Sequence, residues 1–133
     1  MSSIVSHVKI INLDSCLNMA AINFFLDKGY SPKTKTIVFS GLGTASVWTP
    51  LTSTRVTVTD LSISANNAGT IAFYWGNLAG DKVAEFIFAG SSNISPAIGC
   101  WEGTAYDRSL FAKLGGASGT DGVRVNLTGF ELD

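Results

Sequence analysis

The sequence predicts an all-β fold, a single-domain antiparallel β-sandwich or jelly roll with an N-terminal arm. Three observations favour this fold: apolar and polar residues alternate in short runs, glycines cluster between the runs, and the runs follow one another closely. The chain has 133 residues, 14 of them glycine, and is long enough to close one core without disulfide staples. We expect an arm over residues 1–35 and a sandwich over residues 36–133, with about eight or nine strands along the whole chain.

The arm contains one strand-like run followed by one ambiguous run. Residues 4–13 alternate in the manner of a strand. Residues 15–27 fit a helical stripe that ends before a C-cap at Gly29, but AINFFL within them also reads as a strand. Helix and strand therefore both stay open for residues 15–27.

The most regular part of the chain, residues 56–75, alternates, shifts phase and turns. The apolar positions change phase near Thr59–Asp60, as they do where one extra residue forms a β-bulge. Residues 66–69, Asn-Asn-Ala-Gly, predict a tight turn, because Asn and Gly tolerate positive φ. These features predict a bulged hairpin in which the two strands pair with each other and share an apolar inner face.

The other runs alternate or turn in a similar way. The last one alternates as far as Gly129, after which Phe130 and Leu132 continue the apolar series. The predictions are, in order, strands at 34–40 and 46–50 around a GLGT turn, a strand at 83–90, a long loop or two short strands at 91–106, a strand or brief helical turn at 107–114, a loop at 115–122 and a strand at 123–132.

The amino-acid composition indicates which classes of binding partner to expect. Hydrophobic residues make up 46% and charged residues only 14%, with a net charge of −1, so we expect much of the surface to be buried against other subunits. The few Lys and Arg residues form neither a stripe for nucleic acid nor a basic patch for membranes. The N-terminus does not resemble a signal peptide, and Cys16 and Cys100 are expected to be reduced thiols in a chain made in a cytosol.

The sequence contains no set of residues typical of an enzyme. With a single histidine, His7, the chain has little means of building a nucleophile–His pair or a His-rich metal site unless subunits share one, and the ten acidic residues show no paired pattern. The glycine-rich stretch 41–46 lacks the Lys-Ser/Thr of a phosphate-binding loop and predicts a hairpin turn. We therefore predict a protein that is not an enzyme and that has no catalytic residue, metal ligand or cofactor.

Aromatic residues offer the best candidates for exposed contacts. Trp75 alternates with Phe73 and is expected in the core. Trp101 and Tyr106 lie in the long segment 91–106 and are the candidates for an exposed aromatic contact, for which packing or a subunit interface is favoured over a ligand.

The chain resembles the small jelly-roll proteins of tailed bacteriophage virions, namely capsid decoration (cement) proteins and short head or tail fibre domains. The resemblance is one of overall pattern, covers residues 36–132 and is carried by RVTVTDLSIS…AGTIAFYWGN, VAEFIFAGSSNISP, YDRSLFAKLGGA and VRVNLTGFEL. It implies a homotrimer on the outer surface of a capsid, made in the host cytoplasm, whose N-terminal segment grips the shell.

These observations predict a non-enzymatic virion structural protein, a decoration subunit that stabilises a phage head by binding the major capsid protein or other virion proteins. The alternative is a receptor- or carbohydrate-binding jelly-roll domain of a phage fibre or tail tip, which would use Trp101 and Tyr106. The residues expected to contact partners outside the subunit are Ile4, Val8, Ile10, Phe24 and Phe25.

Overall fold

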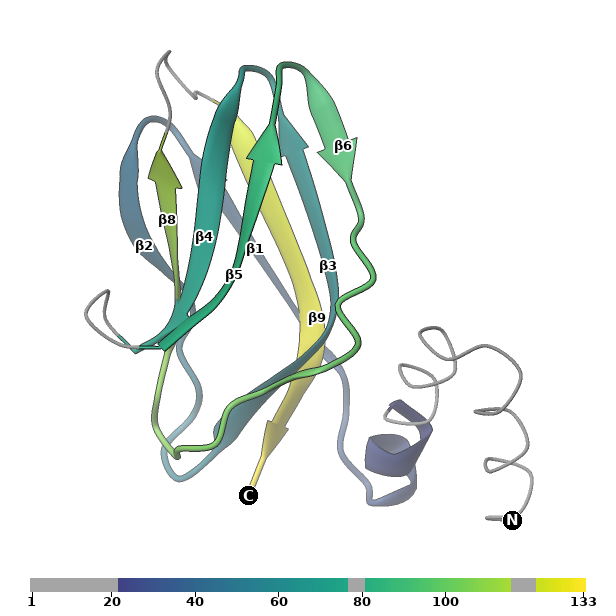
Figure 1. Ribbon diagram of the computed structural model, residues 1–133. Coiled ribbons are helices and arrows are strands. Elements are labelled where there is room, and N and C mark those ends of the chain that lie inside the picture. Colours follow the sequence, from purple (N-terminus) through teal and green to yellow (C-terminus); the bar gives the residue numbers. More distant parts are fainter. Residues whose placement is uncertain (1–21, 77–80, 116–121) are drawn as a thin grey trace.

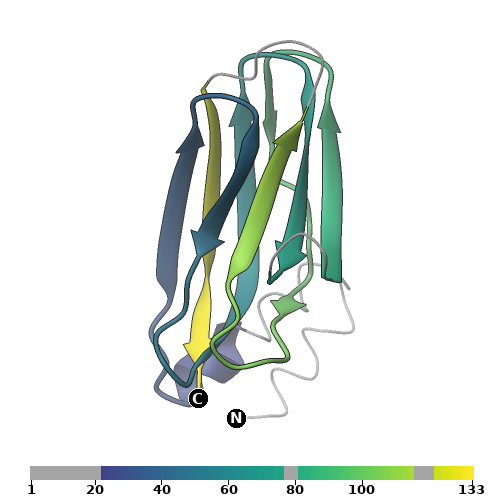
Figure 2. The same ribbon diagram turned by 90° about the vertical axis from the view of Figure 1, so that its left-hand side faces the viewer.

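The computed structural model describes residues 22–76, 81–115 and 122–133, and it shows a β-sandwich of two antiparallel sheets (Figures 1 and 2). Long strands run between the two ends of the sandwich, and the connections gather at these ends. The strands are β1 (Lys33–Phe39), β2 (Gly43–Trp48), β3 (Arg55–Ala65), β4 (Gly69–Trp75), β5 (Asp81–Phe88), β6 (Ser92–Ile94), β7 (Trp101–Glu102), β8 (Leu110–Gly115) and β9 (Val123–Leu132).

The strand order is that of a jelly roll. One sheet has the order β1-β9-β3-β6, with β7 also paired to β3, and the other has the order β2-β8-β4-β5. The pairs are therefore nested along the chain: β1 with β9, β2 with β8, β3 with β6, and β4 with β5. This nesting is the double Greek key of a jelly roll, so the predicted fold class is confirmed.

The core lies between the two sheets and is built by alternate residues of their inner faces. On β3 and β4 the inward side chains that are almost completely buried include Val58, Ile63, Ile71 and Phe73. Trp75, at 9% exposure, also belongs to this cluster, as the alternation predicted. Burial of each such aliphatic or aromatic side chain stabilises the fold by about 1.5–3 kcal/mol.

The bulge predicted in β3 is confirmed, but the predicted hairpin is wrong. The register of β3 against β9 shifts between Val58 and Asp60, which leaves one extra residue on β3. However, β3 and β4 belong to different sheets, and the connection 66–68 crosses from one sheet to the other. The apolar faces of the two strands meet across the core, because each strand finds its hydrogen-bonding partners among segments distant in the sequence.

A short helix precedes β1. Residues 22–27 are helical, so for this part of the segment 15–27 the choice between helix and strand is settled in favour of the helix. Residues 1–21 lie outside the described residues. Gly29, with φ of 88°, donates its N–H to the carbonyl of Leu26, and Tyr30 donates to the carbonyl of Phe25, each at 3.0 Å. These two bonds form the Schellman motif, and they confirm Gly29 as the C-cap.

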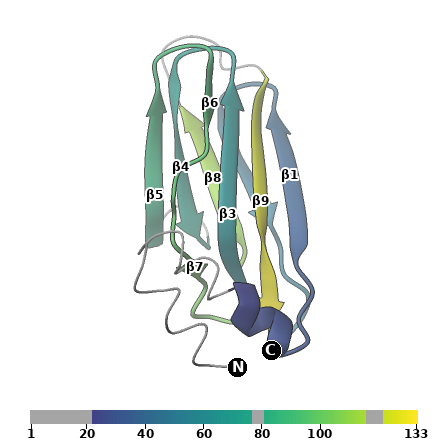
Figure 3. The same ribbon diagram turned by 90° about the vertical axis from the view of Figure 1, so that its right-hand side faces the viewer.

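The helix covers the outer face of the sheet at the C-terminal end of β9 (Figure 3). Phe25 packs against Phe130 with ring centroids 5.0 Å apart, and Leu132 completes this small apolar cluster. The prediction that Phe25 contacts a partner is thereby corrected, since this side chain is only 7% exposed and packs within its own subunit. Phe130 and Leu132 do not continue the inner face either, because the pleat of β9 directs them outward to the helix.

The remaining boundaries differ little from those predicted. β1 begins at Lys33, slightly before the expected start of the sandwich at residue 36. The segment 91–106 contains the two short strands β6 and β7, and 107–114 contains β8 without a helical turn.

Candidate functional site

The residues predicted to contact partners are placed differently by the structure. Ile4, Val8 and Ile10 lie outside the described residues. Phe24 is 56% exposed on the helix, next to the buried Phe25, so it stays available for a partner. Tyr106 is also exposed.

Trp101 is half-buried and belongs to the packed interior. Its ring lies 5.2 Å from that of Phe73 and stacks on that of Phe86 at 6.4 Å, measured between centroids. Trp101 is therefore not the exposed aromatic contact for which it was a candidate, and its packing is the alternative that was favoured over a ligand. Of the two candidates, only Tyr106 is exposed.

One end of the sandwich gathers exposed apolar side chains. At this end, which we call the base, β9 ends, the helix docks, and the loops 49–54 and 103–109 meet (Figure 1). Four of the seven exposed large hydrophobic residues among those described lie there. They are Phe24, Leu26, Leu51 and Tyr106.

The two loops of the base hold each other in place. Ser53 donates its backbone N–H to Asp107 Oδ1 at 2.6 Å, and Asp107 donates its backbone N–H to the carbonyl of Thr54 at 2.8 Å. Ser53 and Asp107 both have positive φ, at 65° and 61°, a conformation that non-glycine residues adopt only when their surroundings impose it. A pocket of about 370 Å³ lies beside them, with Tyr106 and Asp133 as further lining residues.

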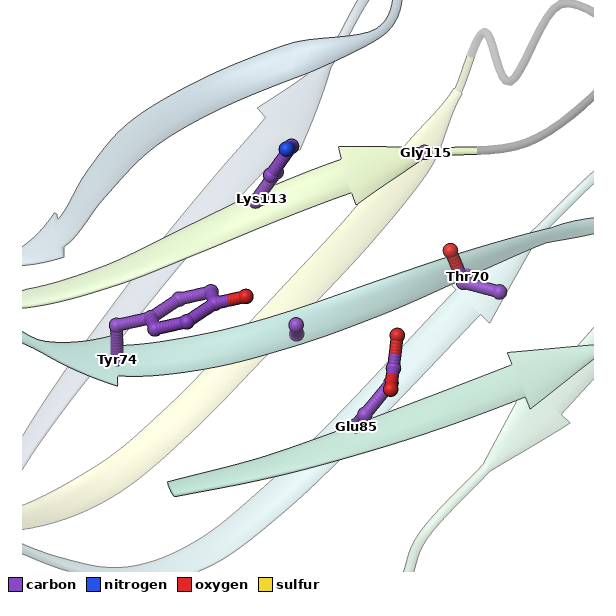
Figure 4. Close-up of a pocket in the computed structure, with 6 residues that line it drawn as sticks. Thr70, Tyr74, Glu85, Lys113 and Gly115 are labelled. Atoms are coloured by element: carbon purple, nitrogen blue, oxygen red, sulfur yellow. The ribbon is translucent and has the colours of Figure 1, made fainter. Parts of the chain in front are cut away.

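A second candidate site is a groove on the outer face of the sheet β2-β8-β4-β5 (Figure 4). Its floor is Ala72 on β4, which is directly opposite Glu85 on β5 and Lys113 on β8 in the strand registers. Tyr74 and Thr70 flank Ala72 along β4, because alternate residues of a strand share a face. The groove has a volume of about 250 Å³.

The two lysines near this groove differ in whether a carboxylate of the described residues pairs with them. Lys82 Nζ contacts Glu85 Oε1 at 2.7 Å, and this hydrogen bond raises the pKa of Lys82. Lys113 is exposed, and no carboxylate within the described residues lies at ion-pair distance from it. The groove therefore presents one ammonium group that is available to a ligand.

Cys100 is a free, half-buried thiol without the features of a nucleophile. Burial, helped by the negative charge of Glu102, raises its pKa to about 11. Reactive thiols have a lowered pKa, because the thiolate is the attacking species.

We therefore expect Cys100 to be alkylated slowly at pH 8. A rise of about two pKa units from the ordinary value of 9.0 lowers the thiolate fraction about 100-fold. The measurement is the rate of iodoacetamide labelling in a Cys16→Ser background, compared with the same chain unfolded in urea. Equal rates in both states would contradict the protection.

The described residues offer neither a metal-binding cluster nor a membrane-spanning helix. Among residues 22–76, 81–115 and 122–133, no three His, Cys, Asp or Glu side chains gather as metal ligands would. No helix in the described part of the chain is long and apolar enough to cross a membrane.

The groove could not be recognised from the sequence alone. Tyr74 was visible as an aromatic residue of a strand, but Ala72 gives no sign that it is the floor of a hollow. The signal that was available is the outward-facing series Thr70, Ala72 and Tyr74, in which a small residue stands between two larger ones. It becomes a groove only when β5 and β8 bring Glu85 and Lys113 to its sides.

No protein-family model and no curated protein matches the sequence. Among solved structures, a chain of the Bacillus endospore appendages, described as a novel family of disulfide-linked pili, is 16% identical with a TM-score of 0.52, covering 78% of this chain and 89% of that one. A chain of the cyanophage Pam1 capsid asymmetric unit is 15% identical with a TM-score of 0.45, covering 78% and 85%. A family 6 carbohydrate-binding module is 10% identical with a TM-score of 0.36, covering 80% and 90%. At these identities the likeness to the appendage chain shows the fold alone.

Proposed function

We propose that this chain is a non-enzymatic structural protein of a phage virion, a decoration subunit that binds the outer surface of the head through its base. The exposed apolar side chains of the base carry the proposal. A soluble domain gains nothing from holding Phe24 and Leu26 in water at 56% and 46% exposure, whereas a subunit that docks there buries them.

The way the helix is held supports this role. Phe25 anchors the helix on Phe130, and the Schellman motif at Gly29 fixes its end. Phe24 on the same helix is thereby presented in a defined position, so little conformational entropy is lost when it binds. The two loops with Ser53 and Asp107 hold the rest of the base in the same way.

The function would follow from mass action. A protein that binds only the assembled shell stabilises it by RT ln(1 + [L]/Kd) for each site. The expected partners are the major capsid protein or other virion proteins, and further copies of this chain. The homotrimer is part of the proposal and is tested by the mass of the full chain in solution.

We expect the double substitution Phe24→Ser/Leu26→Ser to weaken binding to phage heads at least about tenfold, because two apolar anchors are lost from the interface. Both side chains are exposed, so the stability of the chain should change by less than about 1 kcal/mol. The measurement is cosedimentation of the purified chain with heads that lack it, and the melting of those heads with and without the chain.

A matched control is Val38→Ser/Leu42→Ser. These side chains are 54% and 58% exposed but belong to the strand β1 and the turn after it, at the opposite end of the sandwich. Head binding should survive this change. An equal loss of head binding in both double variants, or no head binding by the unaltered chain, would overturn the proposal that the chain attaches through its base.

The second candidate function is recognition of a receptor or carbohydrate by a fibre or tail-tip domain. The groove around Ala72 favours it, because an aromatic ring and several polar groups converge on one open hollow.

A further inference from the structure

We propose that the groove on the outer face of the sheet β2-β8-β4-β5 binds an acidic saccharide, with a sugar ring against Tyr74 and a sugar carboxylate or sulfate on Lys113. This inference deepens the second candidate function and does not depend on attachment through the base. It is carried by the cross-strand arrangement of the five side chains that line the groove and by the charge of Lys113.

The width of the groove comes from a row of three residues. Glu85, Ala72 and Lys113 are direct neighbours across β5, β4 and β8. The outer two Cα atoms are two strand spacings apart, about 10 Å. Since Ala72 carries only a methyl group, the long side chains on either side stand as walls around a flat floor, and the hollow is wide enough for one sugar ring.

The length of the groove lies along β4. Tyr74 closes one end of the groove and Thr70 closes the other. Figure 4 shows that both side chains project from the same face of the sheet as Lys113 and Glu85. Tyr74 is half-exposed and directly opposite Phe111 on β8. Tyr74 therefore presents an apolar ring surface for the C–H groups of a sugar and a hydroxyl for its oxygens.

The floor continues at Gly115, the next outward position of β8 after Lys113. A Cβ atom at Gly115 would lie 3.3 Å from Thr70 Oγ1, so a larger residue there would crowd the end of the groove. Because Gly115 has no side chain, Thr70 Oγ1 stays accessible as a hydrogen-bonding group.

The charges select an acidic ligand. Glu85 already has Lys82 as its ion-pair partner, so its negative charge is balanced. Lys113 has no carboxylate partner within the described residues, which leaves the groove with one net positive charge. A sugar carboxylate or sulfate supplies the missing partner, and Glu85 Oε2 and Thr70 Oγ1 remain for the hydroxyl groups.

The test is isothermal titration of the full chain with an oligogalacturonate, and with a neutral oligosaccharide of the same length. We expect measurable binding of the acidic ligand, and at least about tenfold weaker binding of the neutral one. Lys113→Gln should remove this preference, and Tyr74→Ala should weaken binding of both ligands at least about tenfold.

One control matches the charge variant. Lys28→Gln makes the same change of charge at an exposed position just after the helix. It should bind both ligands as the unaltered chain does.

Several outcomes would overturn the inference: no binding of either ligand, binding that survives Tyr74→Ala and Lys113→Gln, or a stronger preference for the neutral ligand. If neither sugar binds and the two groove variants instead lower the mass of the chain in solution, the groove is an interface between copies. Head binding through the base is measured separately, so either proposal can fail without the other.

Discussion

Gly129→Ala is expected to destabilise the sandwich by about 3 kcal/mol or more, the upper range for overpacking a buried site. Gly129 lies in β9 opposite Val58, immediately beside the bulge of β3. A Cβ atom built on Gly129 would lie only 2.0 Å from the carbonyl oxygen of Thr57 and 2.9 Å from the Cα of Val58. Both are backbone atoms, so no side-chain rotation relieves the clash and the two central strands must separate.

Gly41→Ala is the matched control for this prediction. Its Cβ atom would meet nothing within 4 Å, and Gly41 is not among the glycines with positive φ. The change should therefore be neutral, or stabilising by up to about 1 kcal/mol through the unfolded state. Urea unfolding followed by the fluorescence of the buried Trp48 and Trp75 measures both variants. Equal midpoints would contradict the close approach of β3 to Gly129.

The second large effect concerns Glu131, a carboxylate that faces the interior of the sandwich. Its side chain is 4% exposed and accepts hydrogen bonds from Lys33 Nζ at 2.5 Å and from Trp48 Nε1 at 2.8 Å. Burial raises the pKa of Glu131. The pKa is nevertheless lowered overall, because the opposing effects are larger together: the hydrogen bond and positive charge of Lys33, the hydrogen bond from Trp48 and a backbone hydrogen bond from Leu51.

We expect Glu131→Ala to cost about 3 kcal/mol, because it leaves the buried indole N–H of Trp48 without an acceptor and Lys33 without its ion-pair partner. Glu131→Gln keeps an acceptor oxygen for Trp48 and should cost less. For comparison, Glu85→Gln alters an exposed ion pair with Lys82 and should cost no more than about 1 kcal/mol.

The lowered pKa also predicts how stability depends on pH. Since Glu131 holds its proton less tightly in the folded state, its contribution to stability is fully present above its ordinary, unfolded pKa of 4.5 and is lost as the pH falls through the folded pKa. Urea midpoints of the unaltered chain and of Glu131→Gln should therefore converge as the pH falls through the lowered, folded-state pKa of Glu131. A difference between the two midpoints that stays constant across the whole acid range would show that the charge of Glu131 does not contribute to it.

Several features of the fold could be predicted because they depend on neighbouring residues. Alternation placed Ile71, Phe73 and Trp75 on one face, and the phase shift near Asp60 located the bulge that the register of β3 against β9 shows. Gly29 marked the end of the helix, because a left-handed residue is needed there whatever the rest of the chain does.

The candidate sites could be predicted only in part. Exposure of Tyr106 follows from its position in a connecting segment, whereas Trp101, a candidate for the same kind of contact, packs against Phe73 in the interior. The base and the groove could not be predicted, because each is made by segments that are far apart in the sequence. Tyr106 meets Ser53 and Asp133 at the base, and Ala72 meets Glu85 and Lys113 in the groove.

The sequence by itself therefore determined the class of the fold, the inward faces of β3 and β4, the bulge in β3 and the C-cap at Gly29. Only the tertiary structure decided that β3 and β4 lie in opposite sheets, that Phe130 faces the helix, and that Glu131 faces the interior. The physical reason is that side-chain periodicity is set by the local backbone, whereas strand partners are chosen by hydrogen bonds and burial between distant segments. A run of apolar residues shows that a face is covered, but what covers it depends on the whole chain.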